Sequence, residues 1–178
     1  MKALNYVIEI FKSQYSDQVL DIANVQFGKG YISVSEWDEQ DRPMLVAVLG
    51  DHVLGFCSAD IVSNEDLPHA ELTSILVDDQ VGWIKSLAVN PDNMYQGIGT
   101  ALLEASIALL EMKGIHQLFT EAWRDEGGIR IERMILKNGF IRLAEKENYW
   151  YKDSIQRDYK CVACGQPCCC SAVIYYRI

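Results

Sequence analysis

Two glycines separated by one residue, Gly97-Ile98-Gly99, give this chain its clearest candidate for a binding site. They follow a predicted strand that ends at Pro91 and a polar loop, and they precede an amphipathic helix. Glycine lets the backbone turn and approach a ligand without a Cβ clash. The N–H groups of residues 95–100 then point out of the helix start and, with the helix dipole, form an anion site suited to a pyrophosphate. A two-glycine helix start can also reflect close helix–strand packing alone. The third glycine of a dinucleotide fingerprint and the lysine of a P-loop are both absent.

Residues 82–114 resemble the cofactor motif of the GNAT superfamily, the acyl-CoA-dependent N-acetyltransferases. That motif reads Leu-x-Val-x-Pro, a short loop, Arg/Gln-x-x-Gly-x-Gly/Ala and a Leu-rich helix; Leu87–Pro91 and Gly97–Leu103 match its two ends. A looser resemblance covers Leu49–Ser58, similar to the family's central hairpin, and Lys137–Phe140, similar to its late Gly-Phe pair. The resemblance implies a mixed α/β (α+β) fold with a mostly antiparallel, splayed sheet flanked by helices. It also implies acetyl-CoA as co-substrate.

The chain departs from the family motif at the Arg/Gln position. Counting forward from Pro91 puts that position on Met94 and the usual following glycine on Tyr95, so that Gln96 takes the variable place. An alternative register starts the pattern at Gln96 itself. We prefer the first register because it keeps the spacing from proline to glycine; it removes one side-chain donor to phosphate and keeps the backbone amides. The resemblance then implies cofactor contacts from Leu87, Ala88, Val89, Met94, Tyr95, Gln96, Gly97, Ile98, Gly99 and Thr100.

The resemblance also implies a mechanism, in which an acceptor amine attacks the acetyl-CoA thioester directly. It assigns the oxyanion donor to the backbone N–H of Leu87, at a splay in the sheet, and it pairs Val89 with the pantetheine amides like an added strand. Fixed donors of this kind often supply the largest catalytic term, and losing one costs about 3 kcal/mol in other enzymes.

The general acid is poorly specified by the sequence. Many members of the family place a tyrosine five positions before the phenylalanine of the Gly-Phe pair, and that position is Ile135 here. Tyr149 and Tyr151, in the predicted late strand, are the replacement candidates, and we select Tyr149. Both also fit a purely structural role as sheet aromatics.

For the general base we select Glu121, which ends a predicted strand next to the presumed splay. A carboxylate at the end of a strand is often only solvated. Glu71 and Asp78, in the insertion after the hairpin, are alternatives, and a water relay to any of the three is possible. The histidines are isolated in the sequence and are expected to be structural: His52, His69 and His116.

Five of the six cysteines fall within ten residues, in the pattern Cys161-x-x-Cys164-Gly165-x-Pro167-Cys168-Cys169-Cys170. Such crowding in a cytosolic protein favours metal or redox chemistry over a disulfide framework. Cys161, Cys164, Cys168 and Cys170 are predicted to form a tetrahedral site, with zinc as the first choice. The alternative is a tail of reduced thiols or an incidental disulfide. A bound metal would act as a structural clip for a last strand at residues 172–176.

Alternating and helical periodicities predict the elements that hold these residues. Strands are expected at Tyr6–Phe11, Met44–Leu49, Val53–Val62, Gly82–Val89, His116–Glu121 and Phe140–Tyr151. Helices are expected at Asp17–Phe27, Ser33–Glu36, Thr100–Met112 and Ile129–Lys137. The buried stripe of the long helix is predicted to comprise Ala101, Leu102, Ala105, Leu109 and Met112. The domains are predicted as residues 1–156, the acetyltransferase domain, and residues 157–178, a cysteine-rich tail.

Composition limits the classes of function. The chain has 178 residues and 49% apolar residues, as expected of one globular domain. No apolar run reaches membrane-spanning length, and the N-terminus is too charged for a signal peptide, so we expect a cytoplasmic protein without membrane partners. A net charge of −9 disfavours nucleic acid, including a zinc-knuckle module, and favours cationic amines. A homodimer is possible.

Two functions remain open at this stage. The first is an N-acetyltransferase that acts on a small molecule or on a peptide or protein amine. The second is an acyl-CoA-binding protein of the same fold that does not turn over and serves as a sensor or a partner-binding module. The missing tyrosine and the departure at Met94 favour the second, whereas the glycine loop serves both.

Overall fold

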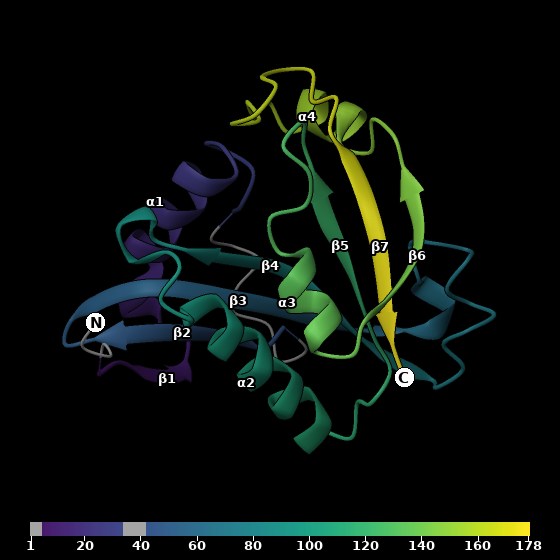
Figure 1. The fold of residues 1–178 in the computed structure, drawn as a ribbon, viewed down its shortest axis with the longest axis horizontal. Helices are drawn as coiled ribbons and strands as arrows, with labels where there is room; N and C mark the ends of the chain where they lie inside the picture. Colours follow the sequence, from purple (N-terminus) through teal and green to yellow (C-terminus); the bar gives the residue numbers. More distant parts are fainter. Residues whose placement is uncertain (1–4, 34–41) are drawn as a thin grey trace.

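The computed structural model describes residues 5–33 and 42–178, which form one mixed sheet with helices on both faces (Figure 1). The strand order is β1-β2-β3-β4-β5-β7-β6. Neighbours run antiparallel throughout, apart from the parallel pair β4 and β5. The strands are β1 Val7–Ile10, β2 Met44–Leu49, β3 His52–Ser63, β4 Gln80–Val89, β5 Leu118–Arg124, β6 Ile141–Lys146 and β7 Ser171–Arg177.

Helices cover the two faces of the first half of the sheet, because β2 is apolar at every position. Val46 packs towards α1 (Ser16–Gln26), whereas its neighbour Ala47 packs towards α2 (Ile98–Met112). Side chains alternate between the faces of a strand, so a continuous apolar run indicates a strand that is buried on both sides. Two further helices are short: α3 Glu132–Lys137 and α4 Tyr151–Gln156. Among the described residues, no helix is long and apolar enough to cross a membrane.

Most of the predicted elements are present, and the strand predicted at Phe140–Tyr151 is wrong in its second half. β6 ends at Lys146, a turn with Asn148 at φ 53° follows, and Tyr151 begins α4, which the sequence did not predict. Aromatic residues favour strands, but here they pack around a turn instead. The helix predicted at Ser33–Glu36 extends into residues 34–41, outside the described residues.

The long helix is confirmed and begins two residues earlier than predicted, at Ile98, but its buried face is different. Met112, assigned to the buried stripe, is 85% exposed, and of the predicted stripe only Leu102 is fully buried. The helix is apolar at most positions, so several stripes satisfy the helical period. Contact with β2, β3 and β4 selects one of them: Ile98, Leu102, Leu103, Ser106, Ile107 and Leu110.

The last strand enters the middle of the sheet's second half. β7 pairs with β5 on one side and with β6 on the other, from Ser171 to Arg177. A last strand at residues 172–176 is therefore confirmed. The sheet continues past residue 156, where the predicted tail begins, and takes in that strand.

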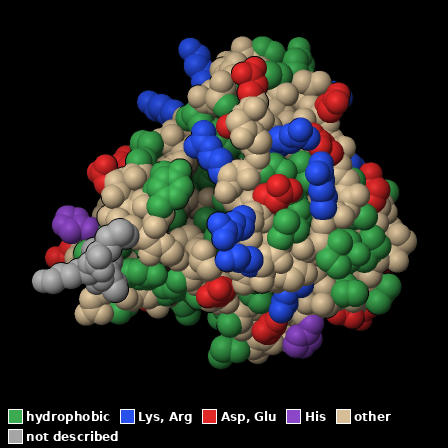
Figure 2. All heavy atoms as spheres, viewed as in Figure 1, with side chains coloured by type: hydrophobic (Ala, Val, Ile, Leu, Met, Phe, Trp, Pro, Cys, Tyr) green, Lys and Arg blue, Asp and Glu red, His purple; other side chains and the backbone are tan. Residues whose placement is uncertain are grey.

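The surface is hollowed between the two halves of the sheet, and Lys and Arg side chains gather around the hollow on the face shown in Figure 2. Lys85 and Arg130 are among the residues that line this cavity. The lining also includes the carboxylates of Glu121 and Asp125. Arg130 pairs with Asp125 at 3.5 Å and Lys85 pairs with Asp60 at 3.1 Å, so carboxylates offset both cations.

Candidate active site

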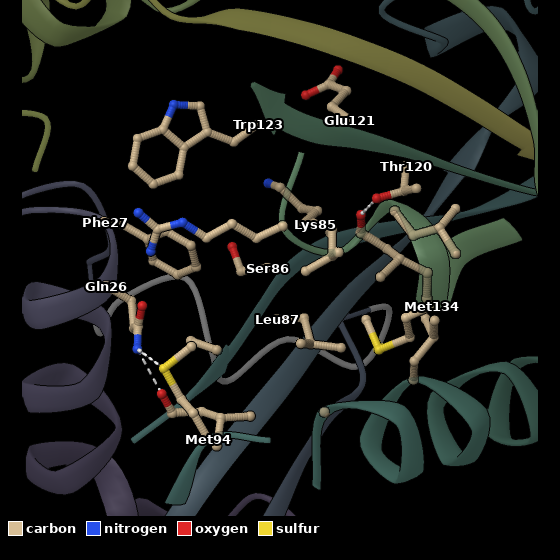
Figure 3. A pocket seen from close by; sticks show the side chains of 18 of the residues that line it. Gln26, Phe27, Lys85, Ser86, Leu87, Met94, Thr120, Glu121, Trp123 and Met134 are labelled. Atoms are coloured by element: carbon tan, nitrogen blue, oxygen red, sulfur yellow. Dashed lines mark hydrogen bonds between the residues drawn. The ribbon is translucent and has the colours of Figure 1, made fainter. Parts of the chain in front are cut away.

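The sheet opens where β4 and β5 separate. These strands pair only over Gly82–Ile84, and beyond that point the hydroxyl of Thr120 donates to the carbonyl of Ile84 at 2.8 Å, as Figure 3 shows. A side chain thereby takes the place of the next backbone hydrogen bond of the ladder. The edge of β4 from residue 85 to residue 89 is left facing the cavity.

A β-bulge at Lys85 sets the direction of the exposed edge of β4. Two consecutive residues of β3, Ser58 and Ala59, pair with Ser86 and Ile84 of β4. Lys85 lies between these two pairs and has no partner in the ladder. The N–H of Gly82 donates to the carbonyl of Gln117, on the β5 side of β4, whereas the N–H of Asn90 donates to the carbonyl of Leu54, on the β3 side. The direction of the backbone N–H groups in a regular strand repeats every two residues, so residues 82 and 90 would point to the same side without a bulge. The extra residue reverses the direction.

After this reversal the backbone N–H and C=O groups of residues 86, 88 and 90 point towards β3. The backbone groups of the alternating residues Leu87 and Val89 therefore point towards the opening. The N–H of Leu87 thus points where the resemblance placed an oxyanion donor. The carbonyl of Val89 already accepts a hydrogen bond from Nε2 of Gln26 at 2.7 Å, and the same nitrogen lies 3.8 Å from the sulfur of Met94. Met94, at the motif's departure, therefore packs at the end of α1 (Figure 3).

The predicted anion site lies at the mouth of α2. Tyr95 and Gly97 both have left-handed backbone conformations, with φ 61° and φ 83°. The first helical bond runs from the N–H of Ala101 to the carbonyl of Gly97 at 3.0 Å. The N–H groups of residues 98–100 consequently have no intrahelical acceptor, and these residues line the cavity. Of the ten predicted cofactor residues, only Gln96 does not line it.

The cavity has a volume of about 350 Å³ and runs from this helix mouth, along the open edge of β4, to the cysteine-rich loop. Its far end is walled by aromatic side chains: Phe27, Tyr31, Trp123, Trp150 and Tyr159. An apolar pocket with a few polar groups is the usual form of a small-molecule site.

The carboxylate of Glu121 lies in this cavity and is held by two donors. Nε2 of His69 lies 2.5 Å from its Oε1, and the hydroxyl of Tyr149 donates to the same oxygen at 2.8 Å. A carboxylate only accepts, so the proton of the first contact belongs to the imidazole. Among the described residues, no donor reaches Oε2. One oxygen therefore fixes the orientation of the carboxylate and the other stays available.

Sequence reasoning missed His69, which it treated as an isolated structural residue. The ring is 1% exposed, and its Nδ1 has no partner among the described residues. Fifty-two positions separate it from Glu121, so no local spacing could have revealed the contact. The only signal was a histidine in an insertion otherwise rich in acidic and apolar residues.

The other acid–base candidates are placed differently. Burial and the charge of Glu121 raise the pKa of Tyr149 well above its ordinary value, so this hydroxyl stays protonated. Tyr149 lies behind Glu121 and does not line the cavity. Tyr151 is exposed on α4, Glu71 pairs with Lys146 at the surface, and neither lines the cavity. Asp78 is likewise exposed and outside the cavity lining.

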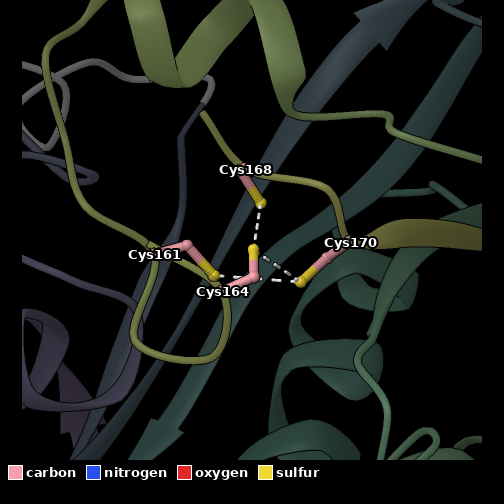
Figure 4. A group of neighbouring side chains, drawn as sticks. All are labelled: Cys161, Cys164, Cys168 and Cys170. Atoms are coloured by element: carbon pink, nitrogen blue, oxygen red, sulfur yellow. Dashed lines mark hydrogen bonds between the residues drawn. The ribbon is translucent and has the colours of Figure 1, made fainter. Parts of the chain in front are cut away.

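The four cysteines predicted as metal ligands come together at the far end of the cavity (Figure 4). Their sulfur atoms all lie within 4.8 Å of one another. Cys169 is exposed; its N–H donates to the sulfur of Cys164 at 3.2 Å, and its thiol also interacts with that of Cys164. Burial alone would raise the pKa of the Cys164 thiol, but hydrogen bonds from Cys169 and neighbouring thiols lower it to about 7. Cys57 lies elsewhere, in β3, where burial raises its pKa to about 12.

Comparisons with known proteins give a family match and a shared fold. The sequence model described as "Acetyltransferase (GNAT) family" matches residues 4–140. Comparison with curated protein sequences gives no match.

Solved structures share the fold at low sequence identity. Arabidopsis thaliana NAA60 in complex with acetyl-CoA has a TM-score of 0.76 and 12% identity, with 97% of each chain covered. The ribosomal-protein-S18-alanine N-acetyltransferase of Escherichia coli has a TM-score of 0.68 and 16% identity, covering 97% of this chain and 92% of its own. Arylalkylamine N-acetyltransferase 2 of Aedes aegypti has a TM-score of 0.66 and 16% identity, covering 98% and 99%. At such identities the likeness concerns the fold alone.

Proposed function

The chain belongs to the acetyltransferase (GNAT) family, and on that premise we propose that it transfers the acetyl group of acetyl-CoA to a primary amine of a small molecule, peptide or protein. One observation carries the proposal. A carboxylate fixed through one oxygen, Glu121, lies in the same cavity as the open edge of β4 and the mouth of α2. The proposed cofactor-binding end and the proposed acid–base end therefore lie in one cavity.

The cofactor would bind along the open edge of β4. Its pyrophosphate would accept hydrogen bonds from the N–H groups of residues 98–100, where the helix dipole favours negative charge. Its pantetheine arm would follow Leu87 and Val89 towards the splay. The carbonyl of Val89 has two lone pairs and already accepts from Gln26, so the arm would share this oxygen or use the N–H of Val89.

Glu121 is proposed as the general base for the acceptor amine. Its free Oε2 would take the proton of the attacking nitrogen, directly or through one water. The nitrogen forms a bond with the thioester carbon, and the N–H of Leu87 stabilises the resulting oxyanion. His69 and Tyr149 act through Glu121 and are positioning residues, because neither lines the cavity.

The reaction then ends with loss of the thiolate of CoA. The tetrahedral intermediate collapses, the C–S bond breaks, and the products are the N-acetylated amine and CoA, whose thiolate takes up one proton. An ordinary thiol has a pKa near 8.5, so the thiolate is a tolerable leaving group without a dedicated acid. The missing tyrosine at Ile135 is therefore compatible with turnover.

The aromatic wall bears on the choice of acceptor. Trp123, Trp150 and Phe27 line the end of the cavity that lies away from α2, and an aromatic surface binds apolar groups and cations alike. We therefore propose an acceptor whose amine is attached to an apolar or aromatic body.

A thiol-release assay with acetyl-CoA and a panel of aromatic, aliphatic and peptide amines tests the proposal. We expect release with at least one class of amine, and we expect Glu121→Gln to lower kcat by about 10²- to 10⁴-fold. Calorimetry should give the same affinity for CoA in both proteins. The matched control is Glu71→Gln, which removes a surface carboxylate outside the cavity and should stay within twofold of the wild type.

The alternative is an acyl-CoA sensor of the same fold without turnover. It predicts tight binding of CoA and no thiol release with any amine of the panel. An unchanged kcat in Glu121→Gln would refute the assignment of the base and leave the acetyltransferase function standing. The cytoplasmic location, the absence of nucleic acid and membrane partners and the homodimer stay predictions from the sequence.

A further inference from the structure

We propose that Cys161, Cys164, Cys168 and Cys170 bind one zinc ion, and that this ion holds the aromatic wall and Tyr149 in position at the acceptor end of the cavity. The second half of this inference rests on the proposed acetyltransferase function. The first half does not, since the geometry of the sulfur atoms carries it alone.

The sulfur positions fit a single tetrahedral ion. A zinc–sulfur bond of about 2.3 Å at tetrahedral angles separates the ligand atoms by roughly 3.8 Å. The structure places the sulfur of Cys164 at 3.5 Å from that of Cys170 and at 3.7 Å from that of Cys168, and Cys161 lies 3.8 Å from Cys170. These sulfurs are free thiols at distances too long for a disulfide bond.

The chemistry of the ligands selects zinc. Four thiolates in a tetrahedral arrangement suit zinc or iron, whereas harder cations prefer oxygen ligands. A cluster with several irons would spread its cysteine ligands over separate metal ions. Here all four sulfurs lie within 4.8 Å of one another, slightly more than twice one zinc–sulfur bond of about 2.3 Å, so one ion can bind all of them once the widest pair closes by a few tenths of an ångström.

The loop is built to present these sulfurs. Cys161 and Gly165 exchange two backbone hydrogen bonds, of 3.0 and 2.9 Å, which close a tight turn around Cys164. Gly165 has φ 83°, a conformation that favours glycine. The N–H of Cys169 points at the sulfur of Cys164, and such donors stabilise a thiolate.

Trp123 and Trp150 pack against the buried cysteines, so most of the site is shielded from water. The loop has no regular secondary structure between residue 157 and residue 170. Its order therefore needs a source other than a helix or a sheet. Metal–ligand bonds provide one, because structural zinc contributes directly to folding.

Direct hydrogen bonds connect the cysteines to the active site. The carbonyl of Cys170 accepts the N–H of Tyr149 at 3.1 Å, and the hydroxyl of Tyr149 bonds Glu121. The N–H of Cys168 donates to Ser154 at 2.9 Å, which ties the loop to α4. Cys161 and Cys168 also line the cavity themselves. Displacing the metal would therefore shift Tyr149 and the aromatic wall.

Metal analysis of protein purified without chelator tests the first half of the inference. We expect one zinc per chain, and after exchange with Co²⁺ we expect the intense visible absorption of tetrahedral cobalt bound by thiolates. Cys164→Ser and Cys168→Ser should lose most of the zinc. Cys169→Ser is the matched control and should retain one zinc, because its side chain is no ligand.

The result that would overturn the site is wild-type protein that contains no stoichiometric zinc and gives no cobalt spectrum, or that contains iron instead. Equal loss of zinc in Cys169→Ser would overturn the ligand set. Affinity for CoA, measured by calorimetry, shows whether each variant is folded, because the cofactor end lies away from the loop. Should Cys164→Ser fail to fold, removal of zinc from wild-type protein with a chelator gives the same measurement.

Acetyl transfer tests the positioning role. Loss of zinc should raise the KM for the acceptor and lower kcat about tenfold or more, while the affinity for CoA stays within about threefold. Full zinc-free activity with an unchanged acceptor KM would refute the positioning role and leave the proposed acetyltransferase intact. A wild-type protein that holds zinc but releases no thiol with any amine would instead refute the proposed function and leave the metal site standing.

Discussion

Substituting the glycines at the mouth of α2 separates the roles of two residues that look equivalent in the sequence. Gly97 has φ 83°, and a Cβ added to it would meet no atom within 4 Å. The cost of Gly97→Ala is therefore backbone strain alone, about 1–2 kcal/mol for a residue with a side chain in the left-handed region. Gly99 is helical, and its added Cβ would lie 3.5 Å from side chains of Leu87 and Val89, an ordinary contact.

The strain at residue 97 divides between stability and binding. If the loop keeps its conformation without ligand, the whole cost appears as lower stability. If the loop relaxes, the cost appears when CoA forces it back. The two losses should sum to about 1–2 kcal/mol, and a loss that falls wholly on binding weakens CoA by about 5- to 30-fold, since 1.4 kcal/mol is tenfold.

Gly99→Ala is the matched comparison, at a second glycine of the proposed cofactor site that has no left-handed backbone. Alanine is favoured over glycine inside a helix by about 0.5–1 kcal/mol, so stability should stay constant or rise. Its methyl group would point at β4, and the affinity for CoA should stay within about threefold. Thermal unfolding and calorimetry with CoA, on the same preparations without acceptor, measure both terms.

Two results would refute this reasoning. One is a Gly97→Ala protein with wild-type stability and wild-type affinity, which would show that the left-handed conformation is not required. The other is equal loss of CoA affinity in both variants, which would show that a methyl group anywhere at the helix mouth blocks the ligand.

Three further substitutions or reagents test other parts of the structure. Tyr149→Phe removes a hydrogen bond to a charged group, worth about 1.5–3 kcal/mol, and should lower kcat about 10-fold or more without changing the affinity for CoA. Burial raises the pKa of Tyr149 above its ordinary value of 10, so its hydrogen bond to Glu121 is present below pH 10 and is lost only above it. An alkaline loss of kcat near pH 8 that disappears in Tyr149→Phe would contradict this. At pH 8 an alkylating reagent should modify the exposed thiol of Cys164 in metal-free native protein, because hydrogen bonds lower its pKa to about 7. The reagent should react more slowly with Cys169, whose pKa is raised by Cys164, and should spare Cys57, whose pKa of about 12 and complete burial suppress the thiolate. Mass spectrometry of native and unfolded protein measures this, and rapid native modification of Cys57 would contradict its burial. Leu110→Ala, at a buried position, should lower the free energy of unfolding by about 2–5 kcal/mol and lower Tm, whereas Met112→Ala, at an exposed position, should change it by no more than about 0.5 kcal/mol. The reverse order would mean that α2 buries its other face.

Local chemistry made part of this protein predictable from its residues. A proline that ends a strand and glycines that open a helix act within a few positions of themselves, so the sequence alone predicts the loop at Gly97. The hairpin of β2 and β3 was read from its turn at Gly50 for the same reason. The clustering of four cysteine sulfurs is equally predictable, because a loop of ten residues keeps them close.

Long-range packing decided the rest. From the sequence Glu121 is one candidate base among several carboxylates, and only the sheet brings His69 from an insertion and Tyr149 from a turn to the same oxygen. The direction of the Leu87 amide depends on one unpaired residue in β4, and a bulge of this kind leaves no mark on hydrophobic periodicity. By itself the sequence determined the candidate residues other than His69, because propensity and spacing are local properties. Only the tertiary structure decided which of them meet, because contacts between distant segments depend on how the whole sheet pairs and on which faces it buries.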